Sequence, residues 1–198
     1  HRDLHSFPTR RSSDLLYTCM DVFSRKIVGW RVEDEESGHY ASLLMEKCIL
    51  EEDTAGYGLC IHSDNGAPMK SSTLKNTLDR LHVTTSLSRP GVSDDNAFPE
   101  SLFRTLKYRP RYPKSHLDLE GWRSWVSGFV EWYNEEHRHS GISYVTPSQR
   151  HQGLDVELLE RRREVYEAAR ARNPRRWIRT TRSWERPIEV RLAPLNAA

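Results

Sequence analysis

The sequence of 198 residues has no long apolar run: no stretch approaches the roughly 18 residues that a membrane-spanning helix needs. It also lacks the apolar segment of a signal peptide. Cysteine is scarce, with three residues that are widely spaced and form no CxxC pair. This argues against a disulfide framework and against a cysteine zinc site. We therefore expect a protein of the reducing cytoplasm with no membrane partner.

Aromatic residues and arginine are well represented. The hydrophobic fraction is only 36%, but 6 Trp, 8 Tyr and 5 Phe argue against general disorder. The length suits one domain with a real core plus a tail. The net charge of +2 conceals an asymmetry, because residues 161–191 hold eleven Arg and four acidic residues, a local net charge of +7. Such a basic end suggests a nucleic acid or another polyanion as partner, with a solvated charged helix as the alternative.

The first fifteen residues, HRDLHSFPTRRSSDL, differ in character from the rest. They have no hydrophobic period and lead into a predicted strand without a turn. They resemble the translation of a common sequencing-adapter oligonucleotide, and we exclude residues 1–15 from fold reasoning on that ground. The alternative is a native polar arm. We expect an N-terminally truncated chain and assign no role to Asp3 or Asp14.

The remaining pattern predicts alternating elements. Strands are expected at 15–22 and 26–33 as a hairpin, then a helix over 38–52, a buried strand at 58–62, a helix over 70–81 and a strand at 83–87. A helix capped by Asp95 or Asn96 runs to about Lys107, and an aromatic stripe marks a helix over 117–137. Residues 141–150 read as a loop, 154–171 as a helix, and the rest as short β pieces. This order predicts an α/β fold with an antiparallel start.

Two carboxylates stand at positions suited to chemistry. Asp64 follows a predicted strand, and Glu100 lies in the first turn of a predicted helix after 35 intervening residues. Each alone has a simpler explanation, as a turn aspartate or a helix-dipole carboxylate. Together, with Arg104 and Lys107 on the face of Glu100, they suggest a Mg²⁺ site flanked by a phosphate path.

Four ordered segments resemble one family. DVFSRKIVGW, HSDNG, SRPGVSDDNAFPESLFRTLK and EWYNEEHRHSGISYVTPSQ are similar to the integrase catalytic core of bacterial insertion-sequence transposases of the IS3 type, which are related to retroviral integrases. The resemblance covers residues 16–153 densely and extends weakly into the tail. It implies a ribonuclease-H-like fold, a five-stranded mixed sheet with three antiparallel strands followed by two parallel ones. It also implies metal-dependent cleavage and transfer of DNA strands at insertion-sequence ends.

The resemblance also implies roles for single residues. Three acidic residues would hold two divalent ions, Mg²⁺ or Mn²⁺; Asp64 matches the second and Glu100 the third. The first belongs on a strand upstream of the hairpin, where the adapter-like segment stands. That strand's place in the sheet should be empty or filled by the adapter-like segment, and this copy should be inactive. DNA contacts are expected from Lys107 and Arg104, with Asn65 and Asn96 orienting the acids.

The basic end fits the same resemblance. Residues 154–198 should form a basic helix and a short β tail that binds DNA backbone through Arg175, Arg176 and Trp177. The protein would act on element ends and target DNA as a homo-multimer in the bacterial cytoplasm, associated with the nucleoid. A second hypothesis remains open, that of a non-catalytic DNA-binding or assembly fragment of a decayed transposase.

Overall fold

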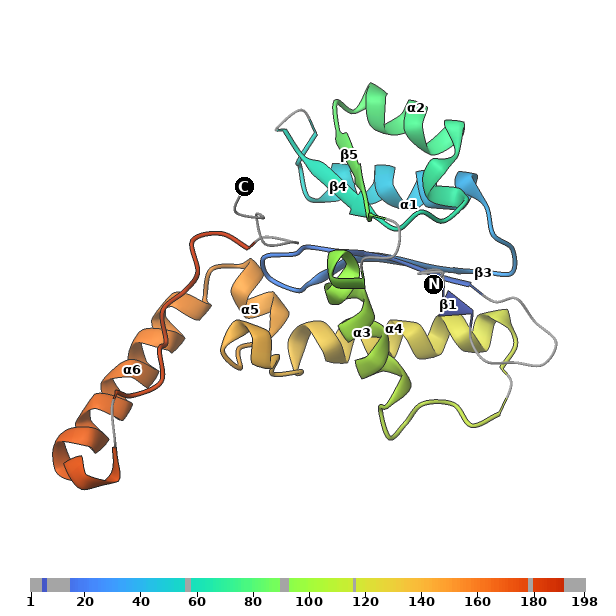
Figure 1. The fold of residues 1–198 in the computed structure, drawn as a ribbon. Coiled ribbons are helices and arrows are strands. Elements are labelled where there is room, and N and C mark those ends of the chain that lie inside the picture. The colour runs from blue at the N-terminus through green and yellow to red at the C-terminus, as the bar shows by residue number, and fades with distance from the viewer. Residues whose placement is uncertain are drawn as a thin grey trace. The chain divides into compact units, whose positions relative to one another are not determined.

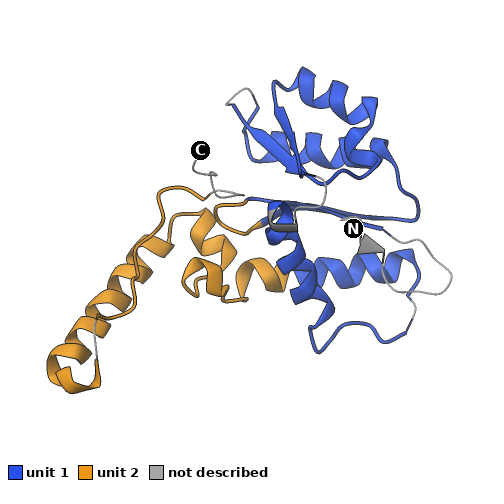
Figure 2. Ribbon diagram, viewed as in Figure 1, with its two compact units in different colours: residues 1–21, 27–130, 191–198 blue, residues 22–26, 131–190 orange. Residues whose placement is uncertain are grey.

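The structure is a computed structural model, and it describes residues 5–6, 15–55, 58–89, 93–115, 117–177 and 180–190. Most of the adapter-like segment therefore lies outside the described residues. The chain divides into two compact units (Figure 2). The first comprises residues 1–21, 27–130 and 191–198, and the second comprises residues 22–26 and 131–190. The division between the units falls inside a helix, and the domain boundary expected at residue 153 stays a prediction.

In the described residues of the first unit, the chain forms the strands β1 to β5 (Figure 1). β2 (Leu15–Met20) and β3 (Ile27–Glu33) pair antiparallel, which confirms the predicted hairpin. β4 (Cys60–Ser63) and β5 (Thr84–Leu87) pair in parallel. β4 is half-buried to exposed, so the expectation of a buried strand was wrong.

The first strand is short. β1 (His5–Ser6) pairs antiparallel with the start of β2, so adapter-like residues occupy this edge of the hairpin. Among the described residues the strands form a three-stranded sheet, β1-β2-β3, and a separate β4-β5 pair. The expected single five-stranded sheet is therefore divided at this point, because a strand of two residues has too few backbone groups to bridge β2 and β4.

Two helices pack on the hairpin in the first unit. α1 (Gly38–Glu51) contacts β2, β3 and α2 (Ser72–Arg80), with η1 (Pro68–Lys70) between them in the chain. The close approach requires a glycine, since a Cβ on Gly29 would lie 2.2 Å from Sγ of Cys48 on α1. The core at this face is formed by Leu15, Tyr17, Ala41, Leu44, Met45, Cys48, Ile49, Leu74, Leu78 and Val83.

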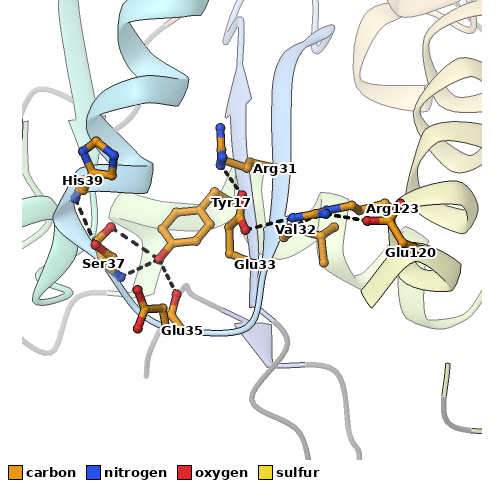
Figure 3. A network of polar contacts seen from close by, with 9 residues as sticks. All are labelled: Tyr17, Arg31, Val32, Glu33, Glu35, Ser37, His39, Glu120 and Arg123. Atoms are coloured by element: carbon orange, nitrogen blue, oxygen red, sulfur yellow. Dashed lines mark hydrogen bonds and ion pairs between the residues drawn. The ribbon is translucent and has the colours of Figure 1, made fainter. Parts of the chain in front are cut away.

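A polar network lies at the open end of the β2-β3 hairpin, opposite the turn that joins the two strands (Figure 3). The Tyr17 hydroxyl accepts a hydrogen bond from the Ser37 N–H at 2.8 Å, and Ser37 in turn caps α1. Partial burial raises the pKa of Tyr17. The Glu33 carboxylate, 5% exposed, binds Arg31 and, at 2.9 Å, Arg123. The network thereby joins β2 to the start of α1, and β3 to the helix that contains Arg123.

Two further helices complete the described part of the first unit. α3 (Ala97–Lys107) buries Leu102, Phe103 and Leu106. α4 (Leu119–Glu135) buries Trp122, Val126 and Phe129, as its aromatic stripe predicts. Figure 1 places α1 and α2 on one side of the β2-β3 hairpin and α3 and α4 on the other.

The second unit is built on a short and a long helix, α5 (Pro147–His151) and α6 (Asp155–Arg172). The predicted loop over 141–150 in fact contains part of η3 (Ser140–Ile142) and most of α5. The helix α5 begins there because Thr146 forms a complete capping box with Gln149. After α6 come η4 (Pro174–Arg176) and an irregular segment. The described part of the tail has no strand, so the prediction of short β pieces was wrong there. In the described residues, no helix combines the length and apolarity needed to cross a membrane.

Candidate active site

Asp64 lies where the sequence predicted it, directly after β4. The residue is 9% exposed, and its Oδ1 accepts a hydrogen bond from the Gly66 N–H at 3.0 Å. This hydrogen bond is typical of an aspartate that closes a turn, which is the simpler structural explanation for Asp64 given by the sequence. A Cβ on Gly66 would lie 3.0 Å from the same oxygen, so a larger residue would crowd the carboxylate.

Side chains join the carboxyl ends of β4 and β5. His62 Nδ1 lies 3.0 Å from Ser86 Oγ, and its Nε2 lies 3.2 Å from Ser88 Oγ. The Asn65 amide donates to the Ser88 carbonyl at 2.6 Å. Asn65 thus binds the end of the neighbouring strand and holds the turn that contains Asp64 against it.

A charged pair continues the same set of contacts toward α3. Asp95, in η2 (Ser93–Asn96), is 5% exposed and accepts hydrogen bonds from the Arg89 guanidinium at 2.7 and 2.9 Å and from the Arg89 N–H at 2.9 Å. These bonds, with a smaller contribution from His62, hold the pKa of Asp95 well below its usual range. The carboxylate also raises the pKa of Arg89. The pair fixes the start of α3 to the residues that follow β5.

Asn96 and Glu100 stand at the beginning of α3. Asn96 occupies the N-cap position and is 8% exposed, but its side chain makes no capping hydrogen bond. The predicted capping by Asp95 or Asn96 side chains is therefore wrong, because Asp95 binds Arg89 instead. Glu100 is exposed in the first turn, with Arg104 and Lys107 exposed beyond it. The three are spaced i, i+4 and i+7 and so share one helix face.

The structure thus brings together the elements that carry the two acids. The contacts run from β4 through Ser88 and Arg89 to Asp95, and α3 begins two residues later. Within the described ranges, no group of three or more His, Cys, Asp or Glu side chains could hold a metal ion. The sequence pattern did not predict the Arg89–Asp95 pair, although an arginine and an aspartate stand on opposite sides of a Pro-Gly dipeptide in the sequence.

The tail residues predicted to bind DNA lie in the second unit. Arg175 and Arg176 are exposed in η4. The Trp177 ring packs edge-on against Tyr166 of α6, with centroids 5.7 Å apart. Trp184 is 7% exposed and packs edge-on against the same tyrosine, with ring centroids 5.0 Å apart. Both tryptophans therefore help to hold the tail on α6.

Comparison with known families decides the assignment. Two family profiles, each described as an integrase core domain, match residues 3–93 and 81–147. The chain belongs to the integrase core family. The first match contains Asp64, the second contains Glu100, Arg104 and Lys107, and the tail lies beyond both.

Curated relatives of this integrase core are insertion-sequence transposases. The transposase for insertion sequence element IS904 of Lactococcus lactis is 33% identical over 150 residues, 73% of this chain and 57% of that protein. Transposase InsF for insertion sequence IS3fB of Escherichia coli is 26% identical over 135 residues, 68% of this chain and 46% of that protein. The chain therefore spans about half the length of these relatives. The predicted kinship with IS3-type transposases is confirmed.

Solved structures support the fold. The integrase core resembles a chain of the simian T-cell lymphotropic virus intasome in complex with PP2A regulatory subunit B56 gamma, with a TM-score of 0.58 and 18% identity over 73% of this chain and 50% of that one. It also resembles the catalytic core domain of BIV integrase, with a TM-score of 0.52 and 20% identity over 76% of this chain and 93% of that one. These likenesses confirm the expected ribonuclease-H-like mixed α/β fold.

Proposed function

We propose that this chain is the catalytic core of a transposase that cuts the ends of an insertion sequence and joins them to target DNA, with Asp64 and Glu100 in its active centre. The observation that carries this is the set of hydrogen bonds joining the end of β4, the end of β5 and the start of α3. Through them Asp64 and Glu100 stand on elements fixed to one another. The transposase names of the relatives favour the same function.

The donor set suits a divalent cation. Asp64 and Glu100 offer hard carboxylate oxygens, and Mg²⁺ needs only one or two protein carboxylates when substrate phosphate and water complete its shell. A bound Mg²⁺ or Mn²⁺ would neutralise phosphate charge and lower the pKa of a bound water or hydroxyl. The resemblance implies two ions and three acids, of which this sequence supplies two. We therefore expect no strand transfer until a third carboxylate is supplied.

Cations beside the acids would position the DNA. Arg104 and Lys107 lie on the face of Glu100, where they would bind phosphates near the reacting bond. Arg175 and Arg176 would also bind DNA backbone, with Trp177 holding η4 on α6. We expect a homo-multimer on DNA, acting at the bacterial nucleoid; one solved relative is part of an intasome.

The test supplies the missing acid and then removes the others. Residues 1–14 are replaced by the corresponding segment of the Lactococcus lactis relative, and transfer of a labelled oligonucleotide is measured in Mg²⁺ and in Mn²⁺. We expect transfer by this chimaera, loss with Asp64→Asn or Glu100→Gln, and retention with Glu51→Gln on the exposed end of α1. Transfer that survives Glu100→Gln would overturn the proposal. DNA binding without transfer by any variant would favour the non-catalytic alternative.

A further inference from the structure

Tyr108 is an exposed aromatic ring in a strongly basic setting. It is the C-cap residue of α3 and is 82% exposed. Tyrosine rings usually cover part of their apolar surface against the protein, so a ring this exposed is available to a partner. The ring stands one residue after Lys107 and four after Arg104.

The charge around Tyr108 has one sign. Residues 104–114, RTLKYRPRYPK, contain five cations and no acid. Within the described part of the chain, the ion pairs involve none of the four exposed cations among them, Arg104, Lys107, Arg111 and Lys114. We call these four residues and Tyr108 the Tyr108 surface. Its charge favours a polyanion.

The segment after α3 is held in place by an aromatic cluster. Tyr112 packs edge-on against Trp125 of α4 at 5.3 Å between centroids, and its burial raises its pKa. Trp125 Nε1 donates to the Arg111 carbonyl at 3.0 Å. The Arg109 guanidinium lies over the Phe129 ring at 5.9 Å. Because these contacts fix the backbone, the Tyr108 surface is supported by α4 and is not a loose loop.

The position of Tyr108 relative to Glu100 follows from helix geometry. Tyr108 is eight residues beyond Glu100, a rise of about 12 Å along α3. At about 100° per residue, the two side chains point within roughly 80° of each other, away from the buried Leu102 and Leu106. At about 3.4 Å per nucleotide along a strand, this corresponds to three or four nucleotides.

We propose that the Tyr108 surface binds a DNA strand beside the active centre and that the Tyr108 ring stacks on an unpaired base three or four nucleotides from the reacting phosphate. This rests on the proposed function and extends it: the substrate would be DNA with a locally opened end. An acidic protein would satisfy the cations but would leave the ring without a planar partner, whereas single-stranded DNA satisfies both.

The experiment compares two DNA probes and uses the full chain in EDTA, so that it is independent of the metal site. One probe is a blunt fluorescent duplex, and the other is the same duplex with a single-stranded tail of five nucleotides. We expect Tyr108→Leu to weaken binding of the tailed probe by about 5- to 150-fold relative to wild type, the range for loss of one base–aromatic stack. Binding of the blunt probe should change by less than about twofold. Tyr108→Trp should keep the preference for the tail.

Charge variants separate the cations from the ring. Arg111→Ala with Lys114→Ala should weaken both probes and reduce the salt dependence by about one unit per cation. Lys75→Ala, at an exposed site on α2, is the matched control and should leave both unchanged. Equal affinity of Tyr108→Leu and wild type for the tailed probe would refute the stacking proposal, as would equal competition by polyglutamate. Either result would leave the proposed function standing, because strand transfer by the chimaera tests that function separately.

Discussion

The buried charge pair of the second unit gives the sharpest stability prediction. Arg150 and Asp155 are both 0% exposed, and Arg150 Nε lies 2.6 Å from Asp155 Oδ2. Arg186, from the tail, lies 3.4 Å from the same oxygen. Arg150 and Arg186 also stand over the Phe23 ring, at 5.4 and 4.9 Å. One carboxylate thus compensates two guanidinium groups, one of them fully buried.

Replacing Asp155 by Asn removes that compensation without a large change in volume. Leaving one partner of a buried pair unpaired costs about 3–5 kcal/mol. For a chain of this size we expect the thermal midpoint to fall by roughly 6–20 °C. Burial already lowers the pKa of Arg150, the direction expected for a cation whose compensation is incomplete.

The assay is urea unfolding followed by tryptophan fluorescence, since Trp184 is buried against Tyr166 of α6 and reports on this unit. Glu157→Gln is the matched control. Glu157 also lies in the first turn of α6 and pairs with Arg161, but those side chains are 74% and 67% exposed. An exposed pair contributes under about 1 kcal/mol.

The double variant Arg150→Met/Asp155→Leu distinguishes a lost charge partner from a lost side chain. Because it removes the buried cation along with its partner, it should recover at least half of the loss caused by Asp155→Asn. A cost of less than about 1 kcal/mol for Asp155→Asn, or a double variant less stable than either single one, would refute the reasoning.

Three further predictions concern the core and two titrating groups. Leu78→Ala, at a site 1% exposed in the first unit, should cost about 2–5 kcal/mol of unfolding free energy in urea, whereas Leu50→Ala, 58% exposed on α1, should cost under about 0.5 kcal/mol. Burial lowers the pKa of His139 to about 4, so the unfolded state binds the proton more readily and stability should fall as the pH drops from about 6.5 toward 4. His139→Asn, which keeps an acceptor for the Gly141 N–H, should flatten that part of the urea midpoint against pH, and an unchanged profile would contradict this. The lowered pKa of Asp95 means that its stabilisation is present above the ordinary carboxyl pKa and is lost as the pH falls below it, so Asp95→Asn should be less stable than wild type at pH 7 and less sensitive to acid, as checked by thermal midpoints from pH 3 to 7.

Local patterns predicted most elements well. The aromatic stripe of α4 and the hairpin of β2 and β3 follow from side-chain periodicity, which depends on near neighbours in the chain. The tail was predicted less well, because its tryptophans owe their positions to Tyr166 of α6 rather than to a strand partner. Short α5 was missed because five residues carry too little periodicity, although Thr146 and Gln149 formed a readable capping box.

The candidate site was predictable only in part. Asp64 and Glu100 stand out because each occupies a characteristic place, after a strand and at the start of a helix. The contacts that hold these two acids in place do not stand out in the sequence. Arg89 pairs with Asp95, and the Asn65 amide donates to the carbonyl of Ser88, 23 residues away. Such partners depend on how β4, β5 and α3 come together, and spacing along the chain does not reveal them.

The tail contains more arginines than are available to bind DNA phosphates. In the described residues, Arg161, Arg163 and Arg170 pair with glutamates of α6, while Arg162, Arg182 and Arg186 contact Trp184 or Asp155. Arg175 and Arg176 stand exposed in η4. With about 0.9 units of salt dependence per neutralised phosphate, these two contribute about 2, whereas eleven arginines would contribute about 10. The salt slope of duplex binding should therefore fall by about 2 in Arg175→Ala/Arg176→Ala and hardly change in Arg161→Ala/Arg163→Ala; equal losses in both would mean that the intrahelical pairs open to bind DNA.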